Sequence, residues 1–284
     1  MIFNIIRLFR SVNRLVRKPS KWKFGSAGYC QSCNRRGIFL FSTELAQWLK
    51  DTTAQWKLSN EFKKSLLERE NHMCCYCDAR FRMRAHAEAV LKLLNMPDTS
   101  ALIRKLKEER RFLIYETAAY NVFRSKKMTR ISNYMISEYF EGMPFGVNVN
   151  NIRNENIEQL TFPDNTFDVL ITSDVLEHVS DLEKALSEIK RVLKSGGFHV
   201  FTIPVDNVLQ KTRERARIVN GKIDHLMEPV MHGDSIRPEG ILAFRDFGGD
   251  VLSYLSRPGL ECNEFKYFIK DKYITSVYYA QKKC

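Results

Sequence analysis

The sequence predicts an α/β protein in which a parallel sheet with crossover helices follows a smaller module that carries paired cysteines. Three observations lead to this prediction. From Phe112 onward, short apolar runs alternate with helical patterns. Before that point the chain contains two Cys-x-x-Cys pairs. The first 111 residues also carry 23 lysines and arginines against 10 acids, whereas the remainder carries 22 against 23.

The composition is that of a globular chain without a membrane-spanning segment. Hydrophobic residues make up 44% of the chain and charged residues 27%, and no apolar run approaches the roughly 18 residues that a transmembrane helix needs. Arg7 and Arg10 interrupt the apolar start, so no signal-peptide core forms. We therefore expect a cytoplasmic protein, whose seven cysteines are reduced thiols or metal ligands rather than a disulfide framework.

Residues 1–24 form a basic amphipathic segment. Apolar residues recur at helical spacing from Ile2 to Val16, with arginines at positions 7, 10, 14 and 17 and no acid. Such a helix either makes peripheral contact with an anionic membrane or packs its apolar stripe on the protein. The basic excess of the whole N-terminal region likewise fits either phosphate-containing partners, including nucleic acid, or a solvated flank.

Residues 25–110 are expected to form a zinc-binding module of helices and short strands. A two-residue spacer lets both sulfurs of a pair reach one tetrahedral ion, and four thiolates leave no open position, so the zinc would be structural. The expected ligands are Cys30, Cys33, Cys74 and Cys77. The alternative is two unrelated pairs of reduced cysteines. Arg80, Arg82 and Arg84 follow the second pair and would either bind phosphate or pair with acids.

Residues 111–284 carry the α/β pattern. A helix is expected after the first strand, and another is predicted to begin at Ser180, where Glu183 completes a capping box, and to end before Gly196. A further helix is predicted near 250–256. The predicted strands are 112–116, 133–138, 167–173, 198–204, 261–269 and 272–281. Residues 174–179 therefore connect a central strand to a helix, at the end of the sheet where open α/β folds bind ligands.

Three motifs in this region, taken in order, resemble those of class I S-adenosylmethionine-dependent methyltransferases. They are Phe162–Asp168 (FPDNTFD), Leu176–Val179 (LEHV) and Leu193–Gly197 (LKSGG). As an ordered set they are far more specific than any one of them alone. The resemblance implies a Rossmann-like sheet of seven strands, the last of them antiparallel, and S-adenosylmethionine as the methyl donor.

The same resemblance assigns residues to the cofactor. The acid that ends the second strand would bind the ribose hydroxyls, the loop before Phe162 the adenine, and the residues after the fourth strand the methionine end. The implied residues are Glu116, Ala118, Tyr120, Glu138, Asn156, Ile157, Ser173, Asp174 and Val175. The first loop departs from the family pattern, because 116–121 lacks the glycines that let backbone approach the cofactor. Tyr120 would crowd such a turn, so binding requires a loop of another shape.

The layout of the whole chain is similar to that of a group of bacterial methyltransferases with an N-terminal zinc-ribbon-like module. Its C-terminal motifs lie at 220–226, 232–234, 238–242 and 246–248. Residues 205–247 form a long insertion, in a position that often covers the methyl acceptor. We therefore expect O-methylation of a small molecule or of a sugar in a glycan. The alternatives are an RNA base methyltransferase that binds RNA through its zinc finger, and a catalytically inactive zinc-binding scaffold.

His178 is the candidate catalytic base. Methyl transfer to a hydroxyl requires a proton acceptor, and a histidine with an ordinary pKa of about 6.5 is largely neutral at pH 7. The alternative is that His178 only forms hydrogen bonds within its loop. His225 and His232, in the insertion, are secondary candidates.

Overall fold

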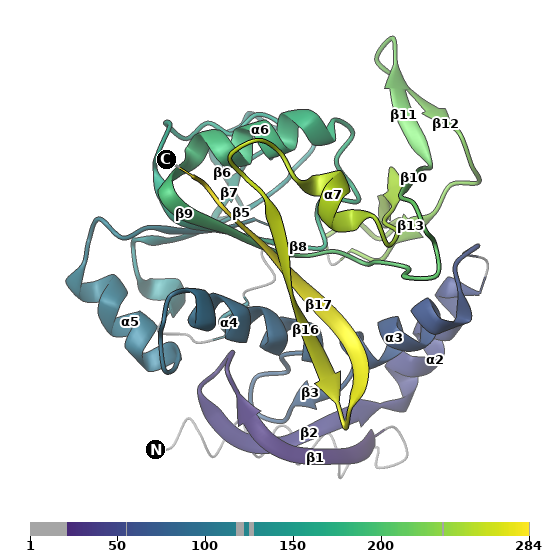
Figure 1. The fold of residues 1–284 in the computed structure, drawn as a ribbon, viewed down its shortest axis with the longest axis horizontal. Helices are drawn as coiled ribbons and strands as arrows, with labels where there is room; N and C mark the ends of the chain where they lie inside the picture. The colour runs from purple at the N-terminus through teal and green to yellow at the C-terminus, as the bar shows by residue number, and fades with distance from the viewer. Residues whose placement is uncertain (1–21, 55, 118–121, 125–127, 235, 284) are drawn as a thin grey trace. The chain divides into compact units, whose positions relative to one another are not determined.

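The computed structural model describes residues 22–54, 56–117, 122–124, 128–234 and 236–283 (Figure 1). The chain divides into two compact units. The described residues of the first unit lie within Met1–Glu108, Val122–Ile131 and Lys266–Thr275, and those of the second within Glu109–Asn121, Ser132–Phe265 and Ser276–Cys284. The basic helix predicted in residues 1–24 lies outside the described residues.

In the part of the chain that the structure describes, the first unit combines a small antiparallel sheet with four α-helices and one 3₁₀ turn. The sheet has the order β1–β2–β3, and the side chain of Ser42 caps the helix that follows β2 by accepting the N–H of Leu45. The strands are β1 (Trp22–Cys30), β2 (Arg35–Ser42) and β3 (Met73–Cys74). The helices are α2 (Thr43–Thr53), α3 (Asn60–Glu70), α4 (Phe81–Leu93), α5 (Thr99–Glu108) and the 3₁₀ turn η2 (Met128–Arg130). Each cysteine pair begins at the last residue of a strand. These residues are Cys30 in β1 and Cys74 in β3.

The second unit is organised around an eight-stranded mixed sheet, whose last two strands, β16 and β17, extend into the Lys266–Thr275 segment of the first unit. Its order is β16–β17–β9–β8–β4–β5–β7–β6. The strands are β4 (Ile114–Thr117), β5 (Tyr134–Glu138), β6 (Asn148–Val149), β7 (Ile152–Asn154), β8 (Phe167–Ser173), β9 (Leu193–Thr202), β16 (Cys262–Ile269) and β17 (Lys272–Gln281). Neighbouring strands from β7 to β9 are parallel, and β17 is antiparallel to β9 as expected. The predicted count of seven missed β6, a two-residue edge strand antiparallel to β7.

The order of the strands reverses between β4 and β8. From β4 the chain adds β5 and then β7 on one side, before β8 and then β9 are added on the other. Such a reversal leaves a crevice outside the carboxyl ends of the two central strands, where open α/β sheets bind ligands. Thr117 and Thr172 are aligned in register near those ends. The topology therefore puts the candidate cofactor site at the ends of β4, β5 and β8.

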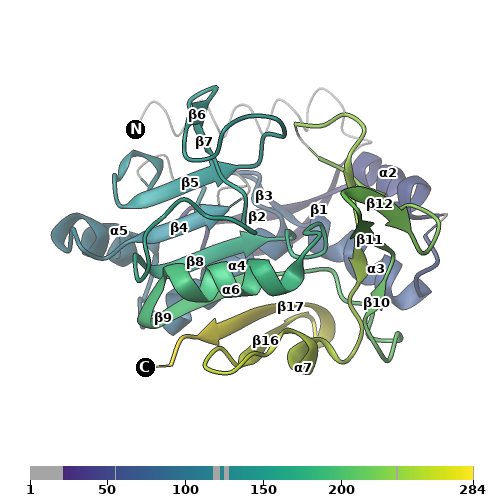
Figure 2. The ribbon, with the colours of Figure 1, turned by 90° about the horizontal axis from the view of Figure 1, so that it is seen from above.

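Helix α6 (Leu182–Val192) covers β8 and β9 (Figure 2). Its apolar residues recur at helical spacing and join the sheet residues of the core, among them Leu170 and Phe201. The N-cap is Asp181, which accepts the N–H of Lys184 at 3.0 Å, and not Ser180 as predicted. Ser180 is engaged elsewhere, because its N–H donates to the carboxylate of Glu158 at 2.6 Å.

Two further predictions need correction. The helix ends at Val192 and β9 begins at once, so the helix stops earlier than the glycines suggested. The helix expected after the first strand is also not found: residues 122–124 and 128–133, the described part of that segment, contain only η2. The helix predicted near 250–256 is confirmed as α7 (Val251–Leu255).

The insertion at 205–247 has secondary structure of its own. Its strands are β10 (Arg213–Glu214), β11 (Ala216–Val219), β12 (Lys222–His225), β13 (Met231–His232), β14 (Ile241–Leu242) and β15 (Arg245–Asp246). They pair as β10 with β15, β11 with β12, and β13 with β14, all antiparallel. The β11–β12 hairpin stands out from the rest of the second unit (Figure 1). Within the described part of the chain, every helix is too short or too polar to cross a bilayer.

Candidate active site and candidate metal centre

The loop that carries His178 is held by the insertion. The carbonyl oxygen of Leu242 lies 2.8 Å from Nδ1 of His178, and the N–H of Phe244 donates to the carbonyl of Glu177 at 2.8 Å. Both contacts join residues more than sixty positions apart in the chain. The insertion therefore runs alongside the Leu-Glu-His-Val motif instead of standing away from it.

A buried arginine strengthens the same contact. Nη1 of Arg245 donates to the carbonyl oxygens of Leu176, at 2.7 Å, and Val179, at 2.8 Å. Arg245 is only 3% exposed, so these are charge-assisted hydrogen bonds with little competition from water. The loop between β8 and α6 thus has its backbone fixed at both ends.

These contacts define the tautomer of His178. A carbonyl oxygen only accepts, so Nδ1 carries the proton and Nε2 keeps its lone pair. Burial is the main influence on the pKa of His178 and lowers it below its ordinary value, against the hydrogen bond to Leu242, which raises it. His178 is accordingly a neutral imidazole with one basic nitrogen.

That nitrogen faces two other ligand-type side chains, and we call Glu177, His178 and His232 the Glu177 cluster. Oε1 of Glu177 lies 3.7 Å from Nε2 of His178 and 3.9 Å from Nδ1 of His232. The two imidazole rings are 4.8 Å apart, edge to face. Glu177 is 1% exposed. The sequence offers His178 and His232 as separate candidate bases, and nothing in it indicates that β13 brings His232 to Glu177 and His178.

The insertion also reaches the end of β5. Arg237 pairs with Asp234 and donates a hydrogen bond to the carbonyl of Tyr139, and its guanidinium lies 5.7 Å from the Tyr139 ring centroid. Tyr139 directly follows Glu138, the last residue of β5. The insertion therefore contacts both the β5 end and the β8 end of the candidate crevice.

Of the residues that the resemblance assigned to the cofactor, Glu138 and Asp174 have the most suitable positions. Both are half-buried and stand at the ends of β5 and β8. Asp174 has φ of 52°, and its N–H donates to the carbonyl of Thr202 at 2.8 Å, which fixes the turn out of the strand. Ser173 is buried, and Val175 is half-buried against the core.

Other residues in that set are used inside the protein. Glu116 is fully buried and accepts a hydrogen bond from the hydroxyl of Tyr134. Oδ1 of Asn156 accepts the N–H two residues later at 2.9 Å, and Ile157 belongs to the hydrophobic core. Ala118 and Tyr120 lie outside the described residues. An open depression of about 850 Å³ lies elsewhere, beside the amino end of α6, and none of these residues lines it.

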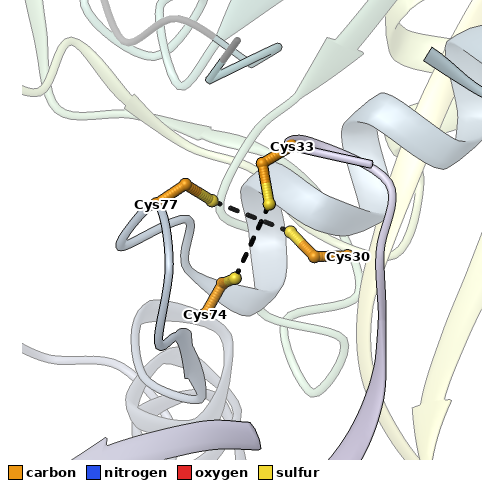
Figure 3. A group of neighbouring side chains, drawn as sticks. All are labelled: Cys30, Cys33, Cys74 and Cys77. Atoms are coloured by element: carbon orange, nitrogen blue, oxygen red, sulfur yellow. Dashed lines mark hydrogen bonds between the residues drawn. The ribbon is translucent and has the colours of Figure 1, made fainter. Parts of the chain in front are cut away.

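The four predicted cysteines meet in the first unit (Figure 3). The Sγ atoms of Cys30 and Cys77 are 3.8 Å apart, and so are those of Cys33 and Cys74. A tetrahedral zinc ion with bonds of about 2.3 Å to sulfur holds neighbouring sulfurs about 3.8 Å apart. These two distances match those expected around a tetrahedral zinc ion, and all four sulfurs lie within 4.8 Å of one another.

The two cysteine pairs share one backbone conformation. The residue after the second cysteine donates its N–H to the carbonyl of the first, at 2.8 Å for Asn34 and 2.9 Å for Asp78. These two residues have φ of 60° and 59°. Asparagine and aspartate tolerate this left-handed conformation better than most residues. Two segments distant in sequence thus form equivalent knuckles around one point.

The arginines beside the second pair are structural. Arg82 and Arg84 are 3% and 7% exposed. Arg82 and Arg80 each approach the buried carboxylate of Glu70 at 2.7 Å, while the Arg84 guanidinium lies 3.5 Å from the ring centroid of Phe39. The interpretation of Arg82 and Arg84 as phosphate-binding residues is therefore wrong, because folding removes them from the surface.

Comparisons with known proteins point to one family. Residues 120–201 match the family described as "Methyltransferase domain". A ubiquinone/menaquinone biosynthesis C-methyltransferase from Hydrogenovibrio crunogenus is 57% identical over 42 residues, which is 15% of this chain and 16% of that protein. An uncharacterized methyltransferase from Schizosaccharomyces pombe is 54% identical over 43 residues, with the same coverage. The match spans about a sixth of the length of these curated relatives.

Solved structures also align with the chain, at lower identity. A methyltransferase from Thermotoga maritima, described as a possible histamine N-methyltransferase, is 16% identical, with a TM-score of 0.37 over 70% of this chain and 91% of its own. The 1,6-didemethyltoxoflavin-N1-methyltransferase of Burkholderia thailandensis is 12% identical, with a TM-score of 0.35 over 70% and 87%.

Proposed function

We propose that this chain is an S-adenosylmethionine-dependent methyltransferase whose cofactor binds at the carboxyl ends of β4, β5 and β8. The observation that carries the proposal is the methyltransferase-family match of residues 120–201, a segment that includes both β5 and β8. The reversal of strand order beside β8 supports the same place on independent topological grounds.

The polar groups at this edge suit the cofactor. Glu138 offers carboxylate oxygens to the ribose hydroxyls, and Asp174 offers negative charge to the methionine ammonium, since both side chains are half-buried and reach the strand ends. Glu116 is assigned no contact with the cofactor, because its carboxylate is buried against Tyr134. When bound, S-adenosylmethionine supplies an electrophilic methyl group. The protein has to align the acceptor with it.

We place the acceptor over His178, beneath the insertion. Nε2 of His178 is a basic nitrogen held in position by Leu242. Arg237 of the insertion contacts the β5 side of the crevice, and Leu242 and Phe244 contact the β8 side. The acceptor class we favour is a small molecule or a sugar with a reactive hydroxyl. The relative from Hydrogenovibrio crunogenus is named for methylation at carbon. Oxygen and carbon acceptors both lose a proton in the reaction, so one histidine serves either.

Structural zinc in the first unit is part of the proposal. The 3.8 Å spacing of the sulfurs and the matching knuckles support an ion held by Cys30, Cys33, Cys74 and Cys77. RNA binding through this unit would have to use other basic residues than Arg82 and Arg84, which are buried. A steep fall of RNA affinity with salt would identify that alternative.

Calorimetric titration with S-adenosylhomocysteine tests the proposal. We expect one site per chain in the zinc-loaded protein, and a loss of at least tenfold in affinity, about 1.4 kcal/mol, for Glu138→Gln. Glu141→Gln is the matched control, because Glu141 is exposed on the loop that follows β5. If the folded protein releases no heat with millimolar ligand, it is a zinc-binding scaffold and not an enzyme.

A further inference from the structure

We propose that the Glu177 cluster binds one divalent transition-metal ion, and that this ion holds an oxygen atom of the methyl acceptor. The first part stands on the geometry of Glu177, His178 and His232 alone. The second part rests on the proposed function. This ion would be separate from the zinc of the cysteine site, which belongs to the first unit.

The three donor atoms are close enough together to bind one metal ion. Oε1 of Glu177 lies 3.7 Å from Nε2 of His178 and 3.9 Å from Nδ1 of His232, and one donor atom from each residue lies within 4.8 Å of the others. A point equidistant from three such atoms is about 2.5 Å or less from each, against bonds of roughly 2.0–2.2 Å from zinc to nitrogen or carboxylate oxygen. Side-chain movements of a few tenths of an ångström complete the coordination.

His178 already has the outer contact that a metal ligand needs. A ligating histidine donates its second ring N–H to a carboxylate, a backbone carbonyl or water, which fixes the tautomer and aims the free nitrogen at the ion. Leu242 supplies this carbonyl at 2.8 Å from Nδ1. The backbone of Leu242 is in turn paired with that of Met231, the residue before His232. The β13–β14 pair therefore positions one ligand directly and orients another.

The burial of Glu177 is compatible with a metal ligand. Its side chain is 1% exposed, and a dication would bring positive charge next to this buried carboxylate.

The set of donor atoms indicates which ions would bind here and what chemistry they would support. Two imidazoles and one carboxylate suit Zn²⁺, Fe²⁺, Co²⁺ or Mn²⁺ better than Mg²⁺ or Ca²⁺, and three protein ligands leave open positions for an acceptor oxygen. A hydroxyl bound there loses its proton to solvent more easily. The new oxygen–carbon bond then forms as the carbon–sulfur bond of the sulfonium breaks. The oxidation state of the ion does not change. His178, whose Nε2 then binds the ion, holds the ion in place and does not itself accept the proton of the hydroxyl.

Cobalt titration of protein whose cysteine site already holds zinc tests the inference without any turnover. We expect one further equivalent of Co²⁺ to bind, with visible d–d absorption and without the ultraviolet charge-transfer band of thiolate ligands. Glu177→Gln and His232→Phe should each weaken this binding by at least about tenfold. His225→Gln is the matched control, because His225 is an exposed histidine of the same insertion.

Each outcome decides the question. The inference is overturned if folded protein binds no second equivalent, or if the two cluster variants bind cobalt as the parent does, with folding checked by circular dichroism. Its failure is distinguishable from failure of the proposed function. Binding of S-adenosylhomocysteine without cobalt binding removes only the ion, whereas cobalt binding without S-adenosylhomocysteine binding leaves a metal site on a protein that is not a methyltransferase.

Discussion

Replacing Glu70 by glutamine should destabilise the first unit strongly. The carboxylate of Glu70 lies 2.7 Å from Nη1 of Arg80, 2.7 Å from Nε of Arg82 and 3.6 Å from Nε of Arg69. Glu70 is 5% exposed, and Arg82 and Arg69 are 3% exposed. The neutral amide of Glu70→Gln would leave buried guanidinium groups without their counter-charge.

The cost follows from this burial. Removing one partner of a buried ion pair costs about 3–5 kcal/mol. We assign it mainly to Arg82 and Arg69, because Arg80 is more than one-third exposed and its share is screened by water. With a urea dependence of about 2 kcal/mol per molar, the midpoint of unfolding should fall by roughly 2 M.

Tryptophan fluorescence during urea unfolding is the assay. All three tryptophans, Trp22, Trp48 and Trp56, belong to the first unit, so their emission reports on it alone. Glu61→Gln is the matched control, because Glu61 is exposed on the same helix, α3. A midpoint for Glu70→Gln equal to that of the control would refute the argument from buried charge.

The stability that the Glu70 carboxylate contributes should depend on pH in one direction. Burial alone would raise the pKa of Glu70, but attraction by Arg82, Arg80 and Arg69 outweighs it and holds the pKa below its ordinary value. A carboxylate of this kind contributes its stability above the unfolded-state pKa of about 4.3, and that stability is lost as the pH falls through the lower folded-state value. The difference between parent and Glu70→Gln should therefore be full at pH 7 and shrink in acid.

Three further changes have expected outcomes. Cys74→Ser should reduce the zinc content by elemental analysis and lower the urea midpoint, because a structural zinc ion contributes directly to folding; unchanged zinc would argue against the site. Asn154→Ala should cost about 3 kcal/mol and abolish hydrogen-exchange protection of the Phe140 amide, since Oδ1 of the buried Asn154 accepts the N–H of Phe140 and its NH2 group lies within 3.1 Å of three carbonyl oxygens of the 140–144 loop. Gly240→Ala should weaken cobalt binding, because φ is +84° and a Cβ there would lie 2.4 Å from the carbonyl oxygen of His232; unaltered affinity would show that this turn does not position the histidine.

Local patterns in the sequence predicted most of the second unit. The apolar run 167–173 became β8 without change, and the run 272–281 became β17, because each is bounded by polar or turn-forming residues. The start of α6 was misplaced by one residue. Its capping box was locally sound, but Glu158, from a distant loop, takes the N–H and hydroxyl of Ser180. Competition of this kind is invisible to a local pattern.

The same distinction between local patterns and long-range contacts applies to the candidate sites. The cysteine cluster could be predicted because the spacing within each Cys-x-x-Cys pair already brings two sulfurs within reach of one ion, and this spacing is visible in four consecutive residues. The Glu177 cluster could not, because its third member arrives on β13, and only the backbone contacts of Leu242 and Phe244 bring that part of the insertion to His178. Glu116 illustrates the opposite case. Its place in the chain suggested a cofactor contact, but its carboxylate is buried under Tyr134.

Hydrogen exchange with and without saturating S-adenosylhomocysteine tests the central claim most directly, because it locates the ligand as well as detecting it. The account predicts slower exchange in peptides that contain Tyr134–Glu138 and the 172–178 segment, at the ends of β5 and β8, with no change in α2 and α3. Protection confined to other parts of the chain, or none at all, would contradict a methyl-donor site at the reversal of the sheet.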